Sequence, residues 1–362
     1  MNRKERTTLL KEQLKKRILV LDGAMGTAIQ DLNLTAEDFG GPEFEGCNEY
    51  LVLTRPDVIQ GIHEAHLAAG ADIIETDTFG GTPVVLDEFS LGDKTAPINE
   101  EAARLARRAA EKFSTPQKPR FVAGSIGPTT KAISVTGGIT FEELVNNFYA
   151  QAKALYAGGA DYFLIETCQD TRNVKAALLA IRKLFEKEEA IPVAVSGTIE
   201  PMGTMLAGQT VEAFVASLAH EDLLYVGLNC ATGPEFMTDH LRSMAGLSPF
   251  AVACVPNAGL PDEDGNYLET PAMMSDVLGR FIEKGWVNLL GGCCGTRAEH
   301  TAAFARLADK QAPREIHPVS TSFLSGLEFL EVNDEMRPVL VGERTNVIGS
   351  RMFKQLIVDG QI

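Results

Sequence analysis

Residues 158–166 read GGADYFLIE and contain three features in succession. The two glycines end a run of helical pattern, because glycine readily adopts the left-handed conformation that stops a helix. Residues 162–165 are apolar without alternation, which is typical of a strand buried on both faces. An acid, Glu166, follows directly. The order of helix, glycine, buried strand and polar residue predicts a parallel sheet covered by helices.

The same unit recurs along most of the chain. Short apolar runs predict eight strands, at residues 18–21, 73–75, 121–123, 162–165, 193–195, 224–228, 250–255 and 287–290. Amphipathic stretches between them predict helices, among them residues 58–69, 99–112, 141–157, 171–187 and 273–284. Eight strands that alternate with helices predict an α/β fold of the (β/α)8 barrel type. A doubly wound sheet would need a G-x-G-x-x-G loop, and residues 22–27 lack that spacing.

Composition restricts the class of protein. Of the 362 residues 45% are hydrophobic, enough for one large barrel with a full core. A formal net charge of −16 argues against nucleic-acid binding. There is no apolar run long enough for a membrane span, and the N-terminal residues lack the apolar segment of a signal peptide. Six cysteines without an export signal indicate unpaired thiols in a reducing compartment, so we expect a cytoplasmic protein.

The pattern changes near the C-terminus. Residues 312–318 (APREIHP) are typical of a linker, and residues 339–341 form one more strand-like run before a short amphipathic stretch. A single strand without a partner is not a domain. We therefore expect a barrel over residues 1–310, a linker over 311–337, and the truncated start of a following domain over 338–362.

Three cysteines suggest a metal site. Residues 291–296 read GGCCGT, and adjacent cysteines do not readily form a disulfide with each other. Cys230 ends the apolar run that predicts the sixth strand, whereas Cys293 and Cys294 follow the eighth. Barrel active sites form at the carboxyl ends of the strands, so the three sulfurs are expected to meet there. Three thiolates with no fourth ligand at short spacing predict a catalytic Zn²⁺ with one open position. The alternative is three buried cysteines without a metal.

The open position indicates the chemistry. Three thiolates already place much negative charge on the ion, so such a zinc activates water poorly. It can still hold a substrate thiol as thiolate near neutral pH. The residues alone therefore predict alkyl transfer to a substrate sulfur.

Other polar residues at the predicted strand ends are candidates for substrate binding. Asp22 and Glu166 could clamp a substrate ammonium, or serve as salt-bridge partners or helix caps. Thr78 could offer its hydroxyl to a carboxylate, or act as a cap or turn residue. Gly23 could present its backbone N–H to the same carboxylate, or be an ordinary turn glycine. Asn257 could place its carbonyl oxygen in the open zinc position, or form a turn before glycine.

Six motifs together resemble a known family. They are residues 21–27 (LDGAMGT), 75–79 (ETDTF), 165–167 (IET), 227–230 (GLNC), 256–259 (PNAG) and 291–296 (GGCCGT). In this order, and over nearly all of residues 10–310, they are similar to the homocysteine-binding module of cobalamin-dependent methionine synthases, within the zinc-dependent homocysteine S-methyltransferases. The resemblance implies a (β/α)8 barrel with zinc on Cys230, Cys293 and Cys294 and with homocysteine thiolate as the fourth ligand.

The resemblance also implies how the rest of homocysteine binds. Its ammonium is expected near Glu166 and Asp22, and its carboxylate near the backbones of Gly23 and Thr78. Methylcobalamin on a separate module would donate the methyl group to the homocysteine sulfur. The products would be methionine and cob(I)alamin.

The tail points to the same branch of the family. Residues 324–328 (LSGLE) and 341–350 (VGERTNVIGS) resemble the junction into a pterin (methyltetrahydrofolate)-binding domain. This implies two partners within a longer chain, that domain and the cobalamin-binding module. One alternative is a stand-alone homocysteine S-methyltransferase that uses betaine or S-methylmethionine. Another is a zinc-stapled binding module without catalysis.

Overall fold

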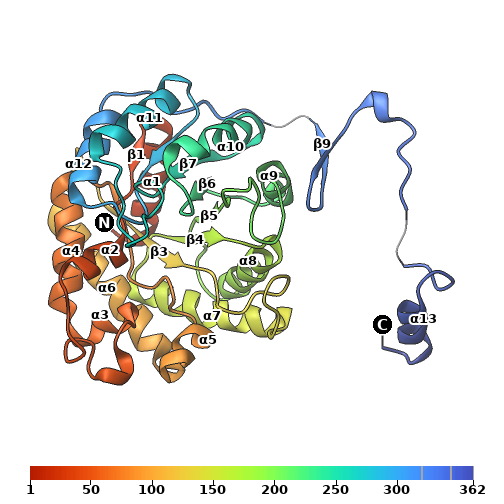
Figure 1. The fold of residues 1–362 in the computed structure, drawn as a ribbon, viewed down its shortest axis with the longest axis horizontal. Helices are drawn as coiled ribbons and strands as arrows, with labels where there is room; N and C mark the ends of the chain where they lie inside the picture. The colour runs from red at the N-terminus through yellow and green to blue at the C-terminus, as the bar shows by residue number, and fades with distance from the viewer. Residues whose placement is uncertain (319–320, 343–344, 362) are drawn as a thin grey trace.

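The structure is a computed structural model that describes residues 1–318, 321–342 and 345–361. The strands of its main body are β1 (Leu19–Val20), β2 (Ile73–Glu75), β3 (Phe121–Ile126), β4 (Tyr162–Cys168), β5 (Val193–Gly197), β6 (Tyr225–Asn229), β7 (Ala251–Val255) and β8 (Leu289–Leu290). They form one parallel sheet in the order β1-β8-β7-β6-β5-β4-β3-β2. A parallel bridge between Leu21 and Ile73 connects the two ends of this order. The predicted (β/α)8 barrel is confirmed, and Figure 1 shows its strands inside a ring of helices.

The helices alternate with the strands as expected. In the barrel they are α1 (Arg3–Lys16), α2 (Met25–Asp31), α3 (Leu51–Thr54), α4 (Pro56–Ala69), α5 (Pro83–Leu86), α6 (Thr95–Phe113), α7 (Phe141–Gly158), α8 (Thr171–Phe185), α9 (Val211–Leu218), α10 (Pro234–Leu247), α11 (Pro271–Glu283) and α12 (Ala298–Ala308). Short 3₁₀ turns lie at η1 (Pro42–Phe44), η2 (Asn48–Tyr50), η3 (Asp87–Phe89) and η4 (Gly92–Lys94).

The ends of α7 show why the helices begin and end where they do. Thr140 and Glu143 form a capping box, in which each side chain accepts a hydrogen bond from the other residue's backbone N–H. The helix ends at Gly159, which has a φ of 107°. Gly70 ends α4 in the same left-handed conformation, with a φ of 117°. Glycine favours this conformation because it has no Cβ to clash with the backbone, so the predicted glycine ends are confirmed.

Strand lengths differ from those expected. β3 continues to Ile126 and β4 to Cys168, so Glu166 lies within β4 and not after it. β1 and β8 are only two residues long, because the sheet pairing at both ends involves few residues. Apolar runs reveal which segments are buried, whereas pairing with neighbours determines where a strand stops.

Side chains fill the interior of the barrel. Leu19, Phe121, Tyr162, Tyr225 and Leu289 belong to one buried cluster, contributed by strands all around the sheet. The hydroxyls of Tyr162 and Tyr225 lie 3.0 Å apart within it. The interior is therefore a packed core, and space for a substrate is left only at the strand ends.

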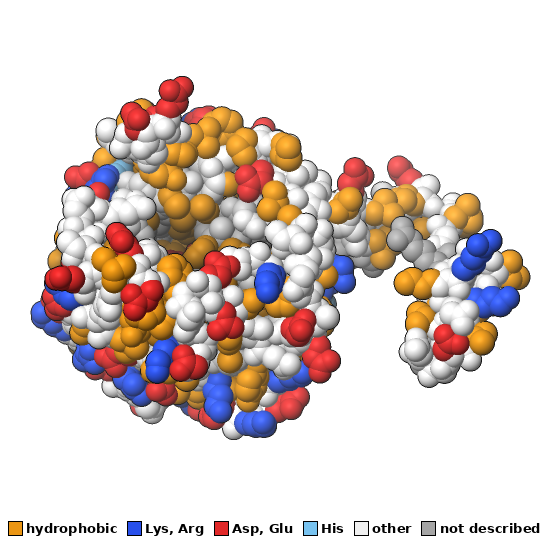
Figure 2. Space-filling model, turned by 60° about the horizontal axis from the view of Figure 1, so that its bottom comes forward, with side chains coloured by type: hydrophobic (Ala, Val, Ile, Leu, Met, Phe, Trp, Pro, Cys, Tyr) orange, Lys and Arg blue, Asp and Glu red, His pale blue; other side chains and the backbone are white. Residues whose placement is uncertain are grey.

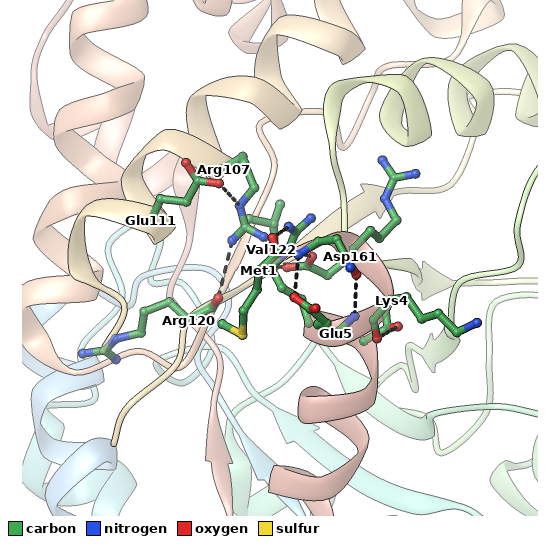
Figure 3. A network of polar contacts seen from close by, with 12 residues as sticks. Met1, Lys4, Glu5, Arg107, Glu111, Arg120, Val122 and Asp161 are labelled. Carbon is green, nitrogen blue, oxygen red and sulfur yellow. Dashed lines mark hydrogen bonds and ion pairs between the residues drawn. The ribbon is translucent and has the colours of Figure 1, made fainter. Parts of the chain in front are cut away.

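Helix α1 closes one end of this core. Its Leu10 and Leu14 belong to the interior cluster. Asp161, just before β4, accepts hydrogen bonds from Arg6 of α1 at 2.6 Å, from Arg107 of α6 at 2.7 Å and from the backbone N–H of Val122 at 2.9 Å. Figure 3 shows Asp161 between the start of α1 and the side chain of Arg107. This buried carboxylate joins three parts of the barrel at the amino ends of its strands.

The C-terminal segment departs from the prediction in one respect. Residues 339–341 were expected to be a strand, and this is wrong: they have no strand partner in the structure. The strands lie earlier, in the antiparallel hairpin of β9 (Ser322–Ser325) and β10 (Phe329–Val332). The backbone carbonyl of Leu327 in its turn accepts a hydrogen bond from the N–H of Thr210, 2.9 Å away, which connects the hairpin to the start of α9.

Beyond the hairpin lie η5 (Asp334–Met336) and α13 (Arg351–Val358), which matches the predicted amphipathic stretch. Figures 1 and 2 show this segment extending away from the barrel, with hydrophobic side chains on its surface. Residues 319–320 of the predicted linker, and 343–344 and 362 of the predicted following domain, lie outside the described residues. Among the described residues, none of the helices combines the length and the apolar character that a bilayer crossing requires.

Candidate active site

Three cysteine sulfurs meet at the carboxyl ends of β6 and β8. Cys230 directly follows β6, and Cys293 and Cys294 follow β8 after two glycines. The three Sγ atoms all lie within 4.8 Å of one another, and those of Cys230 and Cys294 are 3.9 Å apart. All three side chains are half-buried, so the cluster is reachable from the barrel mouth. The structure brings together the three residues that the sequence analysis selected.

Backbone hydrogen bonds from β7 hold the cluster in place. The N–H of Cys293 donates to the carbonyl of Pro256 at 2.8 Å, and the N–H of Cys230 donates to the carbonyl of Val255 at 3.2 Å. The N–H of Cys294 donates to Oδ1 of Asn257 at 3.1 Å. The end of β7 therefore positions sulfurs from the strands on both of its sides.

The backbone at the cluster adopts unusual conformations. Cys230 and Ala231 both lie in the left-handed region, with φ of 63° and 61°. Residues other than glycine rarely adopt it, at a cost of about 1–3 kcal/mol each, and such residues concentrate at functional sites. This turn directs the Cys230 side chain toward Cys293 and Cys294, which follow β8.

The geometry of the sulfurs suits a tetrahedral ion. Zinc–sulfur bonds of about 2.3 Å place two sulfurs of a tetrahedron about 3.8 Å apart. The observed separation of 3.9 Å between Cys230 and Cys294 is close to this value. Within the described parts of the chain, these are the residues whose ligand atoms are grouped closely enough to hold a metal ion. The cluster could hold one with a fourth position left open.

One of the thiols ionises far more readily than the others. Hydrogen bonds from Cys230, and then from Cys293, lower the pKa of Cys294 to about 3. For Cys230, a hydrogen bond from Cys293 lowers the pKa. The hydrogen bond between Cys230 and Cys294 and the burial of Cys230 act in the opposite direction and outweigh it, so the pKa of Cys230 rises to about 12. Hydrogen bonds to Cys230 and Cys294 also raise the pKa of Cys293. A cation bound by the three sulfurs would favour the loss of their protons.

Three carboxyl groups lie close to one another at this end of the barrel, and one of them, Glu166, is near Cys294. Both oxygens of Asp22, which follows β1, accept the backbone N–H of Glu75 at 3.1 and 3.2 Å. Glu166 accepts hydrogen bonds from Oγ of Ser125 at 2.5 Å and from Nδ2 of Asn229 at 3.3 Å. Asp22 and Glu166 are buried, and Glu75 is half-buried.

Burial without a nearby cation raises the pKa of all three acids. Burial raises the pKa of Glu166 to about 7, although the hydrogen bond from Ser125 opposes the shift. Burial also raises the pKa of Asp22, and burial followed by the charges of Glu166 and Asp22 raises that of Glu75. No lysine or arginine contributes to these shifts. The group would therefore gain strongly from a bound cation such as an ammonium.

Two of the alternatives left open for the acids, helix capping and salt bridging, have no support in the structure. The N-cap of α2 is Ala24, and no side chain caps this helix, so Asp22 is not a helix cap. Neither Asp22 nor Glu166 faces a cationic side chain within the described residues, so salt bridging does not account for them either.

The other candidates lie at the same end of the barrel. The hydroxyl of Thr78 donates to the carbonyl of Ser125 at 2.7 Å, and its N–H donates to the carbonyl of Thr76 at 2.9 Å, so both groups already have partners. Oδ1 of Asn257 accepts the N–H of Cys294. A Cβ on Gly23 would come within 2.8 Å of Oγ1 of Thr296, so this glycine allows a close approach between the ends of β1 and β8.

Two neighbours of the cluster were absent from the predicted set. Glu75 ends an apolar strand, as Glu166 nearly does, and the same signal could have found it. Tyr267 lies in the polar loop after β7, and its side chain packs closely against Gly295, the residue after Cys294. Nothing in the local sequence pattern indicates this contact, because loop geometry places the ring.

The chain is similar to one known protein family and to solved structures of the same fold. The sequence model described as homocysteine S-methyltransferase matches residues 19–308. The metallated form of the homocysteine methyltransferase MmuM from Escherichia coli is 24% identical, with a TM-score of 0.66, and the match covers 81% of this chain and 96% of that one. The oxidised form of MmuM is 23% identical with a TM-score of 0.67, covering 84% and 99%. At these identities the structural likeness shows a shared barrel fold.

Proposed function

Because this chain belongs to the homocysteine S-methyltransferase family, we propose that its barrel methylates homocysteine at the Cys230, Cys293 and Cys294 cluster, with Zn²⁺ as the bound metal. The observation that carries the proposal is the approach of three sulfurs within 4.8 Å at the carboxyl ends of the strands. Zinc suits this donor set because thiolates select soft or borderline ions, and it adds no redox chemistry. When bound, zinc would hold the substrate sulfur as a reactive thiolate near neutral pH.

The acids beside the cysteines suit the amino group of homocysteine. Asp22 and Glu166 would accept hydrogen bonds from the ammonium, and its charge would lower their raised pKa values. Ser125 and Asn229 hold the Glu166 carboxyl in place through hydrogen bonds to its two oxygens. Binding the amino acid in this way would orient its sulfur toward the metal ligands.

The carboxylate of homocysteine would lie near the backbones of Gly23 and Thr78, beside the acids. Asn257 would keep the Cys294 backbone in place, since its Oδ1 already accepts that N–H. All six cysteines are free thiols in the structure, which supports a reducing compartment, and we propose a cytoplasmic protein.

For the methyl donor we propose methylcobalamin carried by another module, with methionine and cob(I)alamin as products. This choice depends on the tail, whose sequence resembles the start of a pterin-binding domain. In this reading residues 1–310 are the homocysteine-binding barrel, 311–337 a linker and 338–362 the start of that domain. The alternative is a stand-alone enzyme that uses betaine or S-methylmethionine, small onium donors that need no further module.

An assay of the three donors tests the choice. The full chain, loaded with zinc, is incubated with homocysteine and methylcobalamin, betaine or S-methylmethionine, and methionine is measured. We expect turnover with methylcobalamin. Turnover with either onium donor and none with methylcobalamin would favour the stand-alone enzyme. Removing the metal distinguishes a catalytic zinc from one that only stabilises the fold. A catalytic site should lose activity while the barrel remains folded, whereas loss of a structural zinc should unfold the chain.

A further inference from the structure

Gln151 of α7 is a fully buried polar side chain that faces the strand ends. Its Nε2 donates to the carbonyl of Thr78, in the loop after β2, at 2.7 Å, and to the carbonyl of Ser125, in β3, at 3.4 Å. Its Oε1 has no hydrogen-bond partner among the described residues. Turning the amide over would set this oxygen against the same two carbonyls, acceptor against acceptor, so the two carbonyls determine how the amide lies.

The two residues that Gln151 contacts belong to a closed ring of hydrogen bonds. The N–H of Ser125 donates to Oγ1 of Thr76 at 3.0 Å, and the hydroxyls of Thr76 and Thr78 lie 2.6 Å apart. The Thr78 hydroxyl donates to the Ser125 carbonyl at 2.7 Å, so Thr76 is the donor between the two hydroxyls. All three residues of the ring are buried, where a lost hydrogen bond is costly. The ring fixes the loop after β2 against the end of β3.

The ring leads directly to the acid that faces the mouth of the barrel. Oγ of Ser125 donates to Oε1 of Glu166 at 2.5 Å, so the position of Ser125 determines where this carboxyl lies. In the proposed function Glu166 binds the substrate ammonium, and the backbone of Thr78 lies near the substrate carboxylate. Gln151 is therefore one residue away from the group that binds each charged end of the amino acid.

A second amide holds the same loop from the neighbouring helix. Nδ2 of Asn99, in α6, donates to the carbonyl of Gly81 at 2.7 Å. A Cβ built on Gly81 would lie 2.5 Å from Oδ1 of Asn99 and 2.8 Å from Nε2 of Gln151. A glycine at this position lets both amides come close to the loop. The loop is thus packed tightly against Gln151, and a change at that residue will reach it.

We propose that Gln151 is a positioning residue that makes the barrel specific for the amino acid end of its substrate. Its amide holds the carbonyls of Thr78 and Ser125, and Ser125 in turn holds the Glu166 carboxyl. The recognition of homocysteine rests on the proposed function. The ring of hydrogen bonds does not, so its dependence on Gln151 can be tested without any ligand.

Hydrogen exchange tests the ring directly. The full chain and its Gln151→Met variant, both free of metal and ligand, are placed in deuterated water, and the peptide over residues 76–82 is followed by mass spectrometry. Methionine is similar in size to glutamine but has no side-chain N–H to donate. We expect this peptide to exchange about tenfold faster in the variant, which corresponds to about 1.4 kcal/mol. Gln60→Met is the matched control and should leave the rate unchanged, because Nε2 of Gln60 donates to Glu64 of its own helix at 3.0 Å.

The binding of two thiols to the zinc-loaded chain tests specificity. Homocysteine carries an ammonium and a carboxylate, whereas 1-propanethiol has the same thiol on a three-carbon chain without either group. Calorimetry should show that Gln151→Met weakens homocysteine binding about tenfold and changes 1-propanethiol binding by less than about twofold. An unchanged homocysteine affinity would overturn the proposal. So would an equal loss for both thiols, since that would assign Gln151 a general structural role.

Each remaining outcome also decides a claim. If Gln151→Met does not fold, Gln151→Glu takes its place, because it keeps the shape of the side chain while a carboxylate has no N–H to donate; failure of both to fold would overturn the proposal. If the unmodified chain binds neither thiol, the proposed function fails, yet hydrogen exchange still decides whether Gln151 holds the ring. If homocysteine binds as proposed but neither exchange nor affinity responds to Gln151, only the inference about this glutamine is lost.

Discussion

His63 in α4 predicts a specific acid sensitivity of the fold. Its ring is fully buried, and among the described residues neither ring nitrogen has a hydrogen-bond partner. Burial, and then the charge of His66 one turn along the helix, lowers the pKa of His63 from 6.5 to about 3. The protonated ring has no stabilising contact in the folded state, whereas water solvates it in the unfolded state.

The size of the effect follows from these values. A histidine whose folded pKa is depressed contributes stability above its unfolded pKa, and this is lost as the pH falls toward the folded value. Between pH 7 and pH 5 the unfolded state takes up about 0.7 of a proton at this residue, while the folded state takes up almost none. With an unfolded pKa of about 6.5, the free energy of unfolding falls by about 2 kcal/mol from His63 alone.

Urea unfolding at pH 7, 6 and 5 measures this contribution when the chain is compared with His63→Phe. Other groups titrate equally in both proteins, so the difference isolates His63. We expect the stability of the variant relative to the unmodified chain to increase by about 2 kcal/mol from pH 7 to pH 5. His220→Phe removes an exposed ring and should produce no comparable change. A difference that is independent of pH would refute the assignment of His63 as a buried neutral ring.

Two further substitutions test the barrel and its site. Asp161→Asn should lower the free energy of unfolding by about 3–5 kcal/mol, because it removes the buried carboxylate that pairs with two half-buried arginines, Arg6 and Arg107. Glu111→Gln removes an exposed carboxylate 3.9 Å from Arg107 and should cost under about 0.5 kcal/mol. Equal urea midpoints for the two variants would contradict this. Glu166→Gln should raise the homocysteine KM about 30-fold, equivalent to about 2 kcal/mol for a lost charge-assisted hydrogen bond; an unchanged KM in steady-state assays would remove Glu166 from the ammonium site.

The barrel could be predicted because its signals are local and repeated. Buried parallel strands are apolar on both faces, and glycines such as Gly70 and Gly159 mark helix ends through their own backbone preferences. The cysteines could be chosen because strand order determines which ends meet in a barrel. Residue type and topology were sufficient for both.

The remaining features depend on contacts that no local pattern encodes. Thr78 was selected for its hydroxyl, but a neighbouring strand carbonyl takes up that hydroxyl. Tyr267 lies next to the cysteine pair only because a turn in its loop and the absence of a Cβ on Gly295 let its side chain come close. The strand-like run at 339–341 has no partner strand, whereas the less apolar hairpin of β9 and β10 forms because its two strands are adjacent in sequence.

X-ray absorption at the zinc edge tests the central claim most directly. The zinc-loaded chain is measured with and without homocysteine, and sulfur neighbours of the metal are counted. We predict one zinc per chain with three sulfurs at about 2.3 Å, rising to four when homocysteine binds. In Cys294→Ala, zinc should be lost or held by fewer sulfurs. A chain that binds no zinc, or a sulfur count that homocysteine leaves unchanged, would contradict the account.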